Sequence, residues 1–267
     1  QKVSGFTIVA ERINFLRYLA HFRSVHRGQF FTTMKTTAVR KLLPESWGFL
    51  CPVHTPDGSP CGLLNHLATT CRVVGDGGPK PPPRESPSSL ESILVRLGVA
   101  PMGTGAGDGA SSLPHSFLPV MLDGRVVGGA SEATLQRVVA ELRRLKVLGS
   151  ARGSGGGGGE GGRVEPTLEV GWVPPMKGGA GPYPGLFLST EGARMYRPVL
   201  HLSSGRAEWI GPMEQQFMEI ACLADDVRPG LTTHRELDPT NMLSLVASLT
   251  PFSDYNQSPR NMYQARM

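Results

Sequence analysis

The sequence predicts an α+β fold that is divided into several parts. Apolar residues recur at helical spacing in residues 9–27 and 131–149. Between them, strand-like segments flank an Asp123-Gly124 turn, which is a strong hairpin signal. Stretches rich in Gly, Pro and Ser separate these elements and read as connectors. With 267 residues, the chain is long enough for one large domain or two small ones.

The first predicted helix covers residues 9–27 and ends at Gly28. Its apolar stripe consists of Val9, Ile13, Leu16 and Ala20. Arginines and histidines occupy most of the other positions, and a polar, Thr-rich loop with basic residues follows at 29–40. Within residues 1–46 there are eight Lys or Arg but only two acidic residues, although the whole chain carries a net charge of only +5. This local basicity predicts a face that meets a polyanion; a solvated helix face is the simpler alternative.

The segment from Trp47 to Leu67 combines regularly spaced prolines with large apolar residues. Pro52, Pro56 and Pro60 recur every four residues, which excludes a regular helix and a central strand. Thr55-Pro56-Asp57-Gly58 has the residue order of a tight turn, and such a turn holds the Asp57 carboxylate in a defined direction. Apolar residues at both ends are expected to anchor this loop: Trp47, Phe49, Leu63, Leu64 and Leu67. Read from spacing alone, the segment is either a functional loop or an ordinary structural turn.

The middle of the chain predicts a compact unit at residues 117–149. Strands on both sides of Asp123-Gly124 lead to a helix that Ser131 caps and Gly149 closes. The basic residues Arg143, Arg144 and Lys146 lie in the last predicted turn, where they suit the helix dipole, so they are not assigned to nucleic acid. A shorter helix is predicted at 88–99.

The remaining segments add strands, helices and mobile connectors. Strands are predicted at 167–173, 186–188 and 195–202, as an extension of the sheet that begins at residue 117. Helices are predicted at 211–224 and from Asp238 onwards. The buried residues of the latter are expected to be Met242, Leu243, Leu245, Val246 and Leu249. The segments 75–87, 103–112 and 153–162 are the predicted connectors, and the glycine tract 153–162 lacks the Lys-Ser/Thr of a phosphate-binding loop.

Cysteine usage and hydropathy restrict the class of protein. The four cysteines, Cys51, Cys61, Cys71 and Cys222, form no C-x-x-C pair and have no zinc-ligand spacing. They are interpreted as structural thiols of a reducing compartment. Because there is no signal peptide and no apolar run long enough to span a bilayer, we expect an intracellular protein without membrane contact.

Two long motifs resemble signatures of one family. The first comprises Trp47-Gly48, Cys51-Pro52, Thr55-Pro56-Asp57-Gly58, Gly62-Leu63 and Asn65-His66-Leu67, and the second runs from Asp254 to Gln264. In this order they resemble the second-largest, β-like subunit of multisubunit RNA polymerases. The sequence Val53-His54-Thr55-Pro56-Asp57-Gly58 is most similar to the RNA polymerase I version, because the polymerase II and III versions usually carry Glu where Asp57 stands. The chain is then an internal fragment of a much longer subunit.

The resemblance implies an organisation in four segments. Residues 1–75 correspond to the first half of the fork region, and residues 76–112 form a flexible Pro/Gly/Ser connector. Residues 113–205 correspond to an external domain specific to the polymerase I version. Residues 206–267 return to the fork and begin the wall that holds the RNA–DNA hybrid. The two motifs are therefore expected to meet in space.

The resemblance also implies roles for individual residues. Arg260 matches the position that contacts the incoming triphosphate, and Asp57 matches the acid near the second metal, which its shorter side chain reaches through water. Both count as catalytic positions. The nucleic-acid-binding or nucleotide-binding positions are expected to be Arg40, Lys35, Gln257, Tyr263 and Gln264.

These roles bring expected cofactors and partners. Mg²⁺ is expected, held mainly by aspartates of the largest subunit outside this chain. The expected partners are that subunit, other RNA polymerase I subunits, template DNA, the RNA–DNA hybrid and ribonucleoside triphosphates. The expected location is the nucleus and nucleolus.

Two alternatives remain open at this level. A stand-alone nucleic-acid-binding domain without sequence preference would account for the basic first segment, but not for the placement of the prolines and Asp57. A hydrolase that uses Asp57 with His54 would account for that loop, but the sequence has no nucleophile elbow or metal triad. An isolated polymerase fragment is expected to have no activity by itself, and this separates it from both alternatives.

Overall fold

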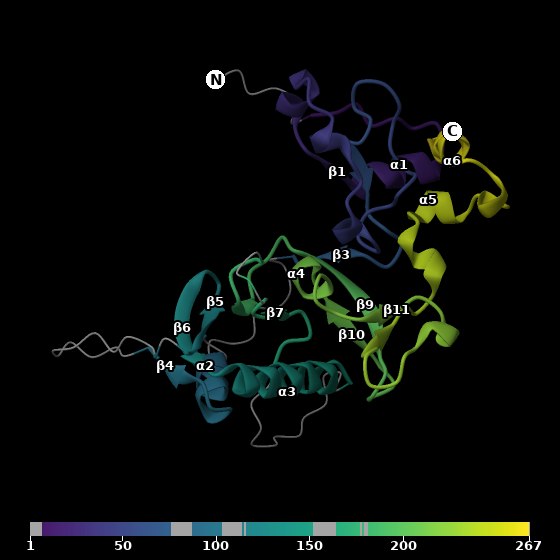
Figure 1. Ribbon diagram of the computed structural model, residues 1–267. Coiled ribbons are helices and arrows are strands. Elements are labelled where there is room, and N and C mark those ends of the chain that lie inside the picture. The colour runs from purple at the N-terminus through teal and green to yellow at the C-terminus, as the bar shows by residue number, and fades with distance from the viewer. Residues whose placement is uncertain are drawn as a thin grey trace. The chain divides into compact units, whose positions relative to one another are not determined.

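The computed structural model describes residues 7–75, 87–102, 114, 116–151, 164–176, 178 and 181–266. The chain divides into two compact units (Figure 1). The first combines Gln1–Arg72 with Leu237–Met267, and the second is Val73–Glu236. The predicted α+β class is confirmed, because both helices and mixed sheets are present. The glycine tract 153–162 and most of the other two predicted connectors lie outside the described residues.

The first unit is built mainly from short elements. Its α-helices are α1 (Phe15–Phe22), α5 (Leu245–Ser248) and α6 (Ser258–Arg266), and α5 packs against both of the others. Strands β1 (Ser24–His26) and β2 (Leu64–His66) pair antiparallel. Single 3₁₀ turns connect these elements: η1 (Gln29–Thr33), η2 (Ala38–Arg40), η3 (Pro44–Ser46), η5 (Pro239–Met242) and η6 (Ser253–Tyr255). The chain's beginning and end thus share one unit.

Helix α1 is shorter than the predicted helix at 9–27. It begins after Asn14, whose side chain accepts a hydrogen bond from the backbone N–H of Arg17 at 2.7 Å. Val9 and Ile13 are 85% and 70% exposed, so they do not belong to a buried stripe. At the other end, residues 24–26 pair with β2 instead of continuing the helix to Gly28. Strand pairing with a distant segment therefore overrode the helical pattern at this end.

The predicted helix from Asp238 is also broken into two short pieces. Asp238 caps η5, and the chain extends before Ser244 caps α5. Leu249 is 59% exposed, and within α5 only Ala247 is buried. The prediction of one continuous helix was wrong, because two successive capping residues start two separate turns. The other predicted buried residues are half-buried: Met242, Leu243, Leu245 and Val246.

The second unit contains two sheets. The first has the strand order β4-β6-β5-β8-β7, in which β5 and β8 are parallel and the other pairs antiparallel. The bounds are β4 (Ala100–Pro101), β5 (Leu118–Leu122), β6 (Arg125–Ala130), β7 (Glu169–Val173) and β8 (Gly185–Ser189). The predicted hairpin at Asp123-Gly124 is confirmed as the β5–β6 connection, with both residues at positive φ.

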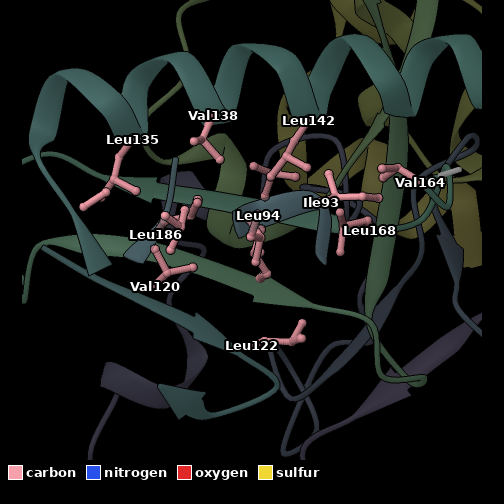
Figure 2. Close-up of a cluster of buried hydrophobic side chains, with 14 residues drawn as sticks. Ile93, Leu94, Val120, Leu122, Leu135, Val138, Leu142, Val164, Leu168 and Leu186 are labelled. Carbon is pink, nitrogen blue, oxygen red and sulfur yellow. The ribbon is translucent and has the colours of Figure 1, made fainter. Parts of the chain in front are cut away.

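Helices α2 (Pro87–Arg96) and α3 (Glu132–Ala151) contribute to the core of this sheet. Figure 2 shows Leu135, Val138 and Leu142 pointing from α3 towards the strand residues Val120 and Leu186. The predicted cap is confirmed, since the Ser131 hydroxyl accepts from the Thr134 N–H at 3.4 Å. The helix runs past Gly149 to Ala151, so the predicted closure at Gly149 was wrong.

The second sheet has the order β10-β9-β12-β11, and β3 (Arg72–Val73) also pairs with β9. Its strands are β9 (Met195–His201), β10 (Arg206–Ile210), β11 (Ile220–Ala221) and β12 (His234–Arg235). The prediction that all three later strands extend the first sheet therefore holds for β7 and β8, but not for β9.

The predicted helix at 211–224 is reduced to α4 (Pro212–Gln215), and a turn η4 (Ala224–Asp226) lies beyond it. Glu214 is 1% exposed and accepts hydrogen bonds from the backbone N–H groups of Gly211 and Val170. The chain then forms β11, which pairs with β12, so sheet pairing ends the helix.

The compact units do not coincide with the four predicted segments. Strands β9 and β10 pair with each other across residue 206, so no break between units occurs there. Residues 206–236 belong to the second unit and only 237–267 return to the first. The predicted connector 76–112 also contains α2 and β4, which contribute to the second unit.

Candidate active-centre surface

The loop that carries Asp57 is anchored in the first unit at both of its ends. Phe49 and Leu63 are 1% and 0% exposed, and Leu67 is also buried. The Cys51 N–H donates to the His66 carbonyl at 2.9 Å, and the Ala68 N–H donates to the Phe49 carbonyl at the same distance. Trp47 is 44% exposed, so it contributes less to this anchor than predicted. The two ends of the loop are thus fastened side by side.

The turn itself is held by hydrogen bonds to its own backbone. The Thr55 hydroxyl donates to the Leu64 carbonyl at 2.8 Å and accepts from the Gly62 N–H at 3.0 Å. Gly62 has φ +73°, and a Cβ there would lie 2.5 Å from the backbone oxygen of Arg40. Only glycine combines this backbone conformation with so close an approach. The loop is therefore a rigid element that presents Asp57 in a fixed direction.

Arg40 is part of this loop's support. Its Nη1 atom donates to the carbonyls of Ser59 at 2.6 Å and Cys61 at 2.9 Å. The guanidinium thus bridges η2 and the far side of the turn, while Lys35, between η1 and η2, is exposed. The structure gives Arg40 a positioning role that the sequence did not reveal.

Helix α6 brings the second motif against the first. Ala265 is 4% exposed and packs in one cluster with Cys51 and Ala247. Arg260, Tyr263 and Gln264 are all exposed, and their i, i+3, i+4 spacing puts them on one face of α6. Gln257 lies just before the helix and is exposed as well. One side of α6 therefore fastens the motif, and the other side displays the predicted site residues.

Asp57 contacts the C-terminal end of the same helix. Its Oδ1 atom forms an ion pair with Nη1 of Arg266, and the two side chains are 38% and 46% exposed. Arg266 lies six residues after Arg260, which corresponds to about 9 Å along the helix and about 120° around it. Asp57 thus meets a flank of α6, next to the face that carries Arg260. Whether Asp57 and Arg260 face one cleft stays a prediction.

The spacing of the two motifs gave no sign of the Asp57–Arg266 pair. Arg266 lies outside the quoted second motif, and Ala265 is a small residue with no distinctive pattern. Helical periodicity from the exposed Arg260 would have placed Ala265 on the opposite, buried side. This periodicity is the signal in the sequence from which the buried side of α6 could have been inferred.

Several basic residues of the first segment are already engaged within the unit. Arg17 forms an ion pair with Glu11 at 3.0 Å. Arg23 donates through Nη2 to the carbonyls of Ala68, Thr69 and Cys71, the shortest distance being 2.8 Å. Together with Arg40, these contacts hold part of the segment's guanidinium groups within the unit, so fewer of their N–H donors are available to a polyanion. They weaken the alternative of a stand-alone nucleic-acid-binding domain.

His54 faces the interior, away from Asp57's exposed surroundings. It is 2% exposed, and its ring stacks on that of His66 with centroids 3.5 Å apart. Its Nδ1 atom lies 2.8 Å from the Ser244 hydroxyl. Burial, with smaller effects from His66 and Arg17, lowers its pKa to about 3. Burial also lowers the pKa of His66 to about 4. A neutral, enclosed imidazole does not suit the alternative of a hydrolase that pairs His54 with Asp57.

Among the described residues, one group of three potential metal-ligating side chains lies close together, and it is in the second unit. In the second unit, one ligand atom each of His201, Glu208 and His234 lie within 4.8 Å of one another. However, Glu208 also pairs with Lys146 at 3.1 Å and Arg143 at 2.9 Å. A divalent cation there would be repelled by both cationic side chains. We therefore interpret this cluster as an ion-pair network.

This network corrects the interpretation of the basic residues in α3. Lys146 is 1% exposed and pairs with Glu214 at 2.8 Å. Although burial tends to raise the pKa of Glu208, the hydrogen bond from His234 and the charges of Lys146 and Arg143 bring it well below its ordinary value. Of the three basic residues, Arg144 forms an exposed pair with Glu141. Lys146 is thus a buried partner and Arg143 a partly buried one, and neither is a surface charge that responds to the helix dipole.

Asp57 does not belong to any group of three metal-ligating side chains among the described residues. Mg²⁺ is usually bound through one or two carboxylates together with waters and substrate phosphates, so Asp57 would share such an ion with ligands from outside the described residues. All four cysteines are free thiols, and of these Cys51 and Cys71 are buried. Within the described segments, no helix is both long enough and apolar enough to cross a bilayer.

Comparison with known proteins defines the class to which this fold and surface belong. A family model described as RNA polymerase Rpb2, domain 3, matches residues 8–73. A second, described as RNA polymerase I, Rpa2 specific domain, matches residues 127–197. The chain belongs to the Rpb2 family of RNA polymerase subunits, as the two motifs predicted.

Within this family, the similarity to polymerase I subunits extends over the full chain. The chain is 49% identical over 267 residues to DNA-directed RNA polymerase I subunit rpa2 of Dictyostelium discoideum. It is 50% identical over 267 residues to subunit RPA2 of Neurospora crassa and 48% identical over 265 residues to that of Homo sapiens. These alignments cover 99–100% of this chain but only 19–22% of the relatives. The chain thus spans about a fifth of the length of the curated relatives it matches.

Proposed function

We propose that this chain forms part of the second-largest subunit of a DNA-directed RNA polymerase I and contributes a wall of its active centre. There the enzyme joins ribonucleoside triphosphates on a DNA template during ribosomal RNA synthesis. The observation that carries this proposal is the contact between the first motif and α6, the helix that carries most of the second motif: Ala265 packs against Cys51, and Arg266 pairs with Asp57. Identity of about one half to polymerase I subunits across both motifs supports it.

The exposed face of α6 is the nucleotide side of this wall. Arg260 binds the incoming triphosphate, because a guanidinium stays charged and pairs bidentately with phosphate oxygens. Tyr263, Gln264 and Gln257 line the same surface. The Arg260 cation also stabilises the charge that develops on the departing pyrophosphate.

Asp57 and the basic loop before it complete the wall. Asp57 acts near the second metal through a water molecule. Lys35 contacts nucleic acid from its exposed position between η1 and η2. Arg40 acts indirectly, since its hydrogen bonds to Ser59 and Cys61 hold the loop in place.

The metal and the partners lie outside this chain. Mg²⁺, held mainly by the largest subunit, steadies the attacking and leaving oxygens. The partners are the largest and other RNA polymerase I subunits, template DNA and the RNA–DNA hybrid, in the nucleus and nucleolus. Large apolar side chains exposed on the first unit support the presence of covering partners; they include Phe15 (74%), Phe252 (75%) and Tyr255 (84%).

The experiment is single-nucleotide extension on a preassembled RNA–DNA scaffold, with the assembled polymerase that contains this chain. Arg260→Ala is expected to slow nucleotide addition roughly thirty- to a thousandfold, because losing such a contact costs about 2–4 kcal/mol in the transition state. Arg260→Lys keeps the charge but not the planar fork, so it is expected to restore only part of the rate. Arg137→Ala, at an exposed position of α3, is the matched control. A near-normal rate for Arg260→Ala in a fully assembled enzyme would remove Arg260 from the site.

A further inference from the structure

The turn η6, which leads into α6, is held by two asparagine side chains. Nδ2 of Asn256 donates to the Phe252 carbonyl at 3.0 Å, and Nδ2 of Asn261 donates to the Ser253 carbonyl at 2.7 Å. The same two carbonyls accept the backbone N–H groups of Tyr255 at 3.1 Å and of Asn256 at 3.4 Å. Each carbonyl therefore has one side-chain donor and one backbone donor.

The backbone of Phe252 explains why this turn requires support. Phe252 has φ +54° and ψ 34°, the left-handed region that residues with a side chain rarely adopt. Such a conformation persists only where the surrounding contacts fix it, and it is found preferentially at functional sites. The Phe252 ring is 75% exposed, so the hydrogen bonds to its carbonyl contribute more to this conformation than packing does.

Asn261 joins this turn to the helix that carries the proposed nucleotide contact. It directly follows Arg260 on α6, and its side chain reaches back to Ser253. Between these two points lies Gln257, whose carbonyl accepts the N–H groups of Arg260 at 3.0 Å and Asn261 at 3.1 Å. Gln257 and Arg260 are exposed, whereas Asn261 is half-buried. Asn261 is therefore placed to support the exposed residues on both sides of the helix start.

We propose that Asn261 is a positioning residue for Arg260, an inference that rests on the proposed function. Its amide fastens the first turn of α6 to η6, and this attachment fixes the direction in which the Arg260 guanidinium leaves the helix. The role requires a donor at Nδ2, because the Ser253 carbonyl can only accept a hydrogen bond. Its bond to Ser253 is partly buried and meets less competition from water than the exposed bond of Asn256.

The test is a double-mutant cycle in the assembled polymerase, measured as single-nucleotide extension on an RNA–DNA scaffold at limiting nucleotide. Asn261→Leu keeps the approximate size of the side chain but has no donor. It is expected to lower kcat/KM about ten- to a hundredfold, since a displacement of about 1 Å at a reacting group has effects of this size. Asn261→Gln retains an amide donor on a longer side chain and is expected to restore part of the rate.

The decisive comparison is made in the Arg260→Ala background. If Asn261 acts through Arg260, the double variant Asn261→Leu/Arg260→Ala is expected to be no slower than Arg260→Ala alone. Asn241→Leu changes a half-buried asparagine of η5, outside both motifs, and is the matched control with a near-normal rate. If Asn261→Leu does not assemble, Asn261→Ala, which lacks the donor and adds no bulk, takes its place in the cycle.

The outcomes separate this inference from the function on which it rests. A near-normal rate for Asn261→Leu beside a slow Arg260→Ala would overturn the positioning role alone. Equal effects of Asn261→Leu with and without Arg260 would also overturn it, because Asn261 would then act independently. Failure of both Asn261 variants to assemble would make Asn261 a residue required for folding and would reject the positioning role. A near-normal Arg260→Ala would contradict the proposed function itself.

Discussion

At the scale of single residues, the role of a side chain depends on which of its atoms are already engaged. Arg40 and His54 both belong to the region of the first motif, and the sequence assigned each of them a surface role in one interpretation. In the structure, Arg40 donates hydrogen bonds to the carbonyls of Ser59 and Cys61, and the buried ring of His54 stacks on that of His66. The resemblance predicted a site in this loop, but the sequence did not distinguish residues exposed on the loop from residues that hold it in place.

The stacked histidines make a prediction about pH. Their pKa values are about 3 and about 4 in the folded chain, whereas both titrate near 6.5 when exposed. Between these values the unfolded chain binds more protons, so the free energy of unfolding is expected to fall as the pH falls from 6.5 towards 4. Each histidine contributes at most about 1.4 kcal/mol per pH unit, and below about pH 3 this pair causes no further loss.

Urea unfolding at several pH values measures this dependence. His66→Asn retains a donor for the His54 carbonyl but does not titrate, so its stability should decline less steeply with acid. His26→Asn, at an exposed position, is the control and should follow the wild type. An unchanged pH dependence in His66→Asn would show that the buried pair does not govern acid stability.

Asp57 and Arg266 give a prediction that separates stability from function. Their ion pair is 38% and 46% exposed, and pairs of this kind contribute about 0–1 kcal/mol. Asp57→Asn and Arg266→Gln are therefore each expected to change the free energy of unfolding by less than about 1 kcal/mol. Chemical denaturation of the full chain measures this. A loss above about 2 kcal/mol in either variant would mean that the pair fastens α6 to the loop.

At the scale of elements, α3 shows what periodicity can and cannot predict. Its cap at Ser131 and its apolar stripe were visible in the sequence, and they are confirmed. The sequence did not show where the basic side chains of α3 point. Arg143 and Lys146 pair with acidic residues on β10 and α4, which are at least 62 positions away in sequence. Local helix propensity does not predict such long-range contacts.

This buried network predicts unequal effects of neighbouring substitutions. Lys146→Ala would leave Glu208 and Glu214 with less compensation in the interior, so it is expected to destabilise the second unit by about 3–5 kcal/mol. Arg144→Ala removes an exposed pair with Glu141 on the same helix and should cost less than about 1 kcal/mol. Denaturant unfolding followed by circular dichroism compares the two, and equal effects would contradict the assignment of Lys146 to a buried network.

The same reasoning explains the elements that the sequence predicted wrongly. The helices expected at 9–27 and 211–224 both end early: residues 24–26 pair as β1, and β11 pairs within the second predicted range, beginning five residues after α4 ends. The hairpin at Asp123-Gly124 was predictable, because its turn residues and its strands are adjacent in the chain. Strand pairing between distant segments therefore decided most of the differences between pattern and structure.

At the scale of the whole molecule, the division into units follows contacts instead of chain order. The first unit joins both ends of the chain and contains both motifs, while the second contains the segment matched by the Rpa2 specific domain. The sequence predicted that the motifs would meet, and the packing of Ala265 with Cys51 brings α6, which carries most of the second motif, against the first motif. The boundary at residues 72–73 lies close to the predicted connector that begins at residue 75. The boundary at residues 236–237 could not be read from composition, since no Gly/Pro/Ser-rich stretch marks it.

The central claim is that the exposed face of α6 lines the active centre of an RNA polymerase. The most direct measurement is site-specific photo-cross-linking in the assembled enzyme, stalled on an RNA–DNA scaffold with the next nucleotide bound. A photoreactive residue in place of Tyr263, which is 40% exposed on α6, is expected to cross-link to the RNA 3′ end or to the nucleotide. The same residue in place of Tyr183, which is 72% exposed in the second unit, is expected to give no such product. The absence of a cross-link at position 263, or equal cross-linking at both positions, would contradict the account.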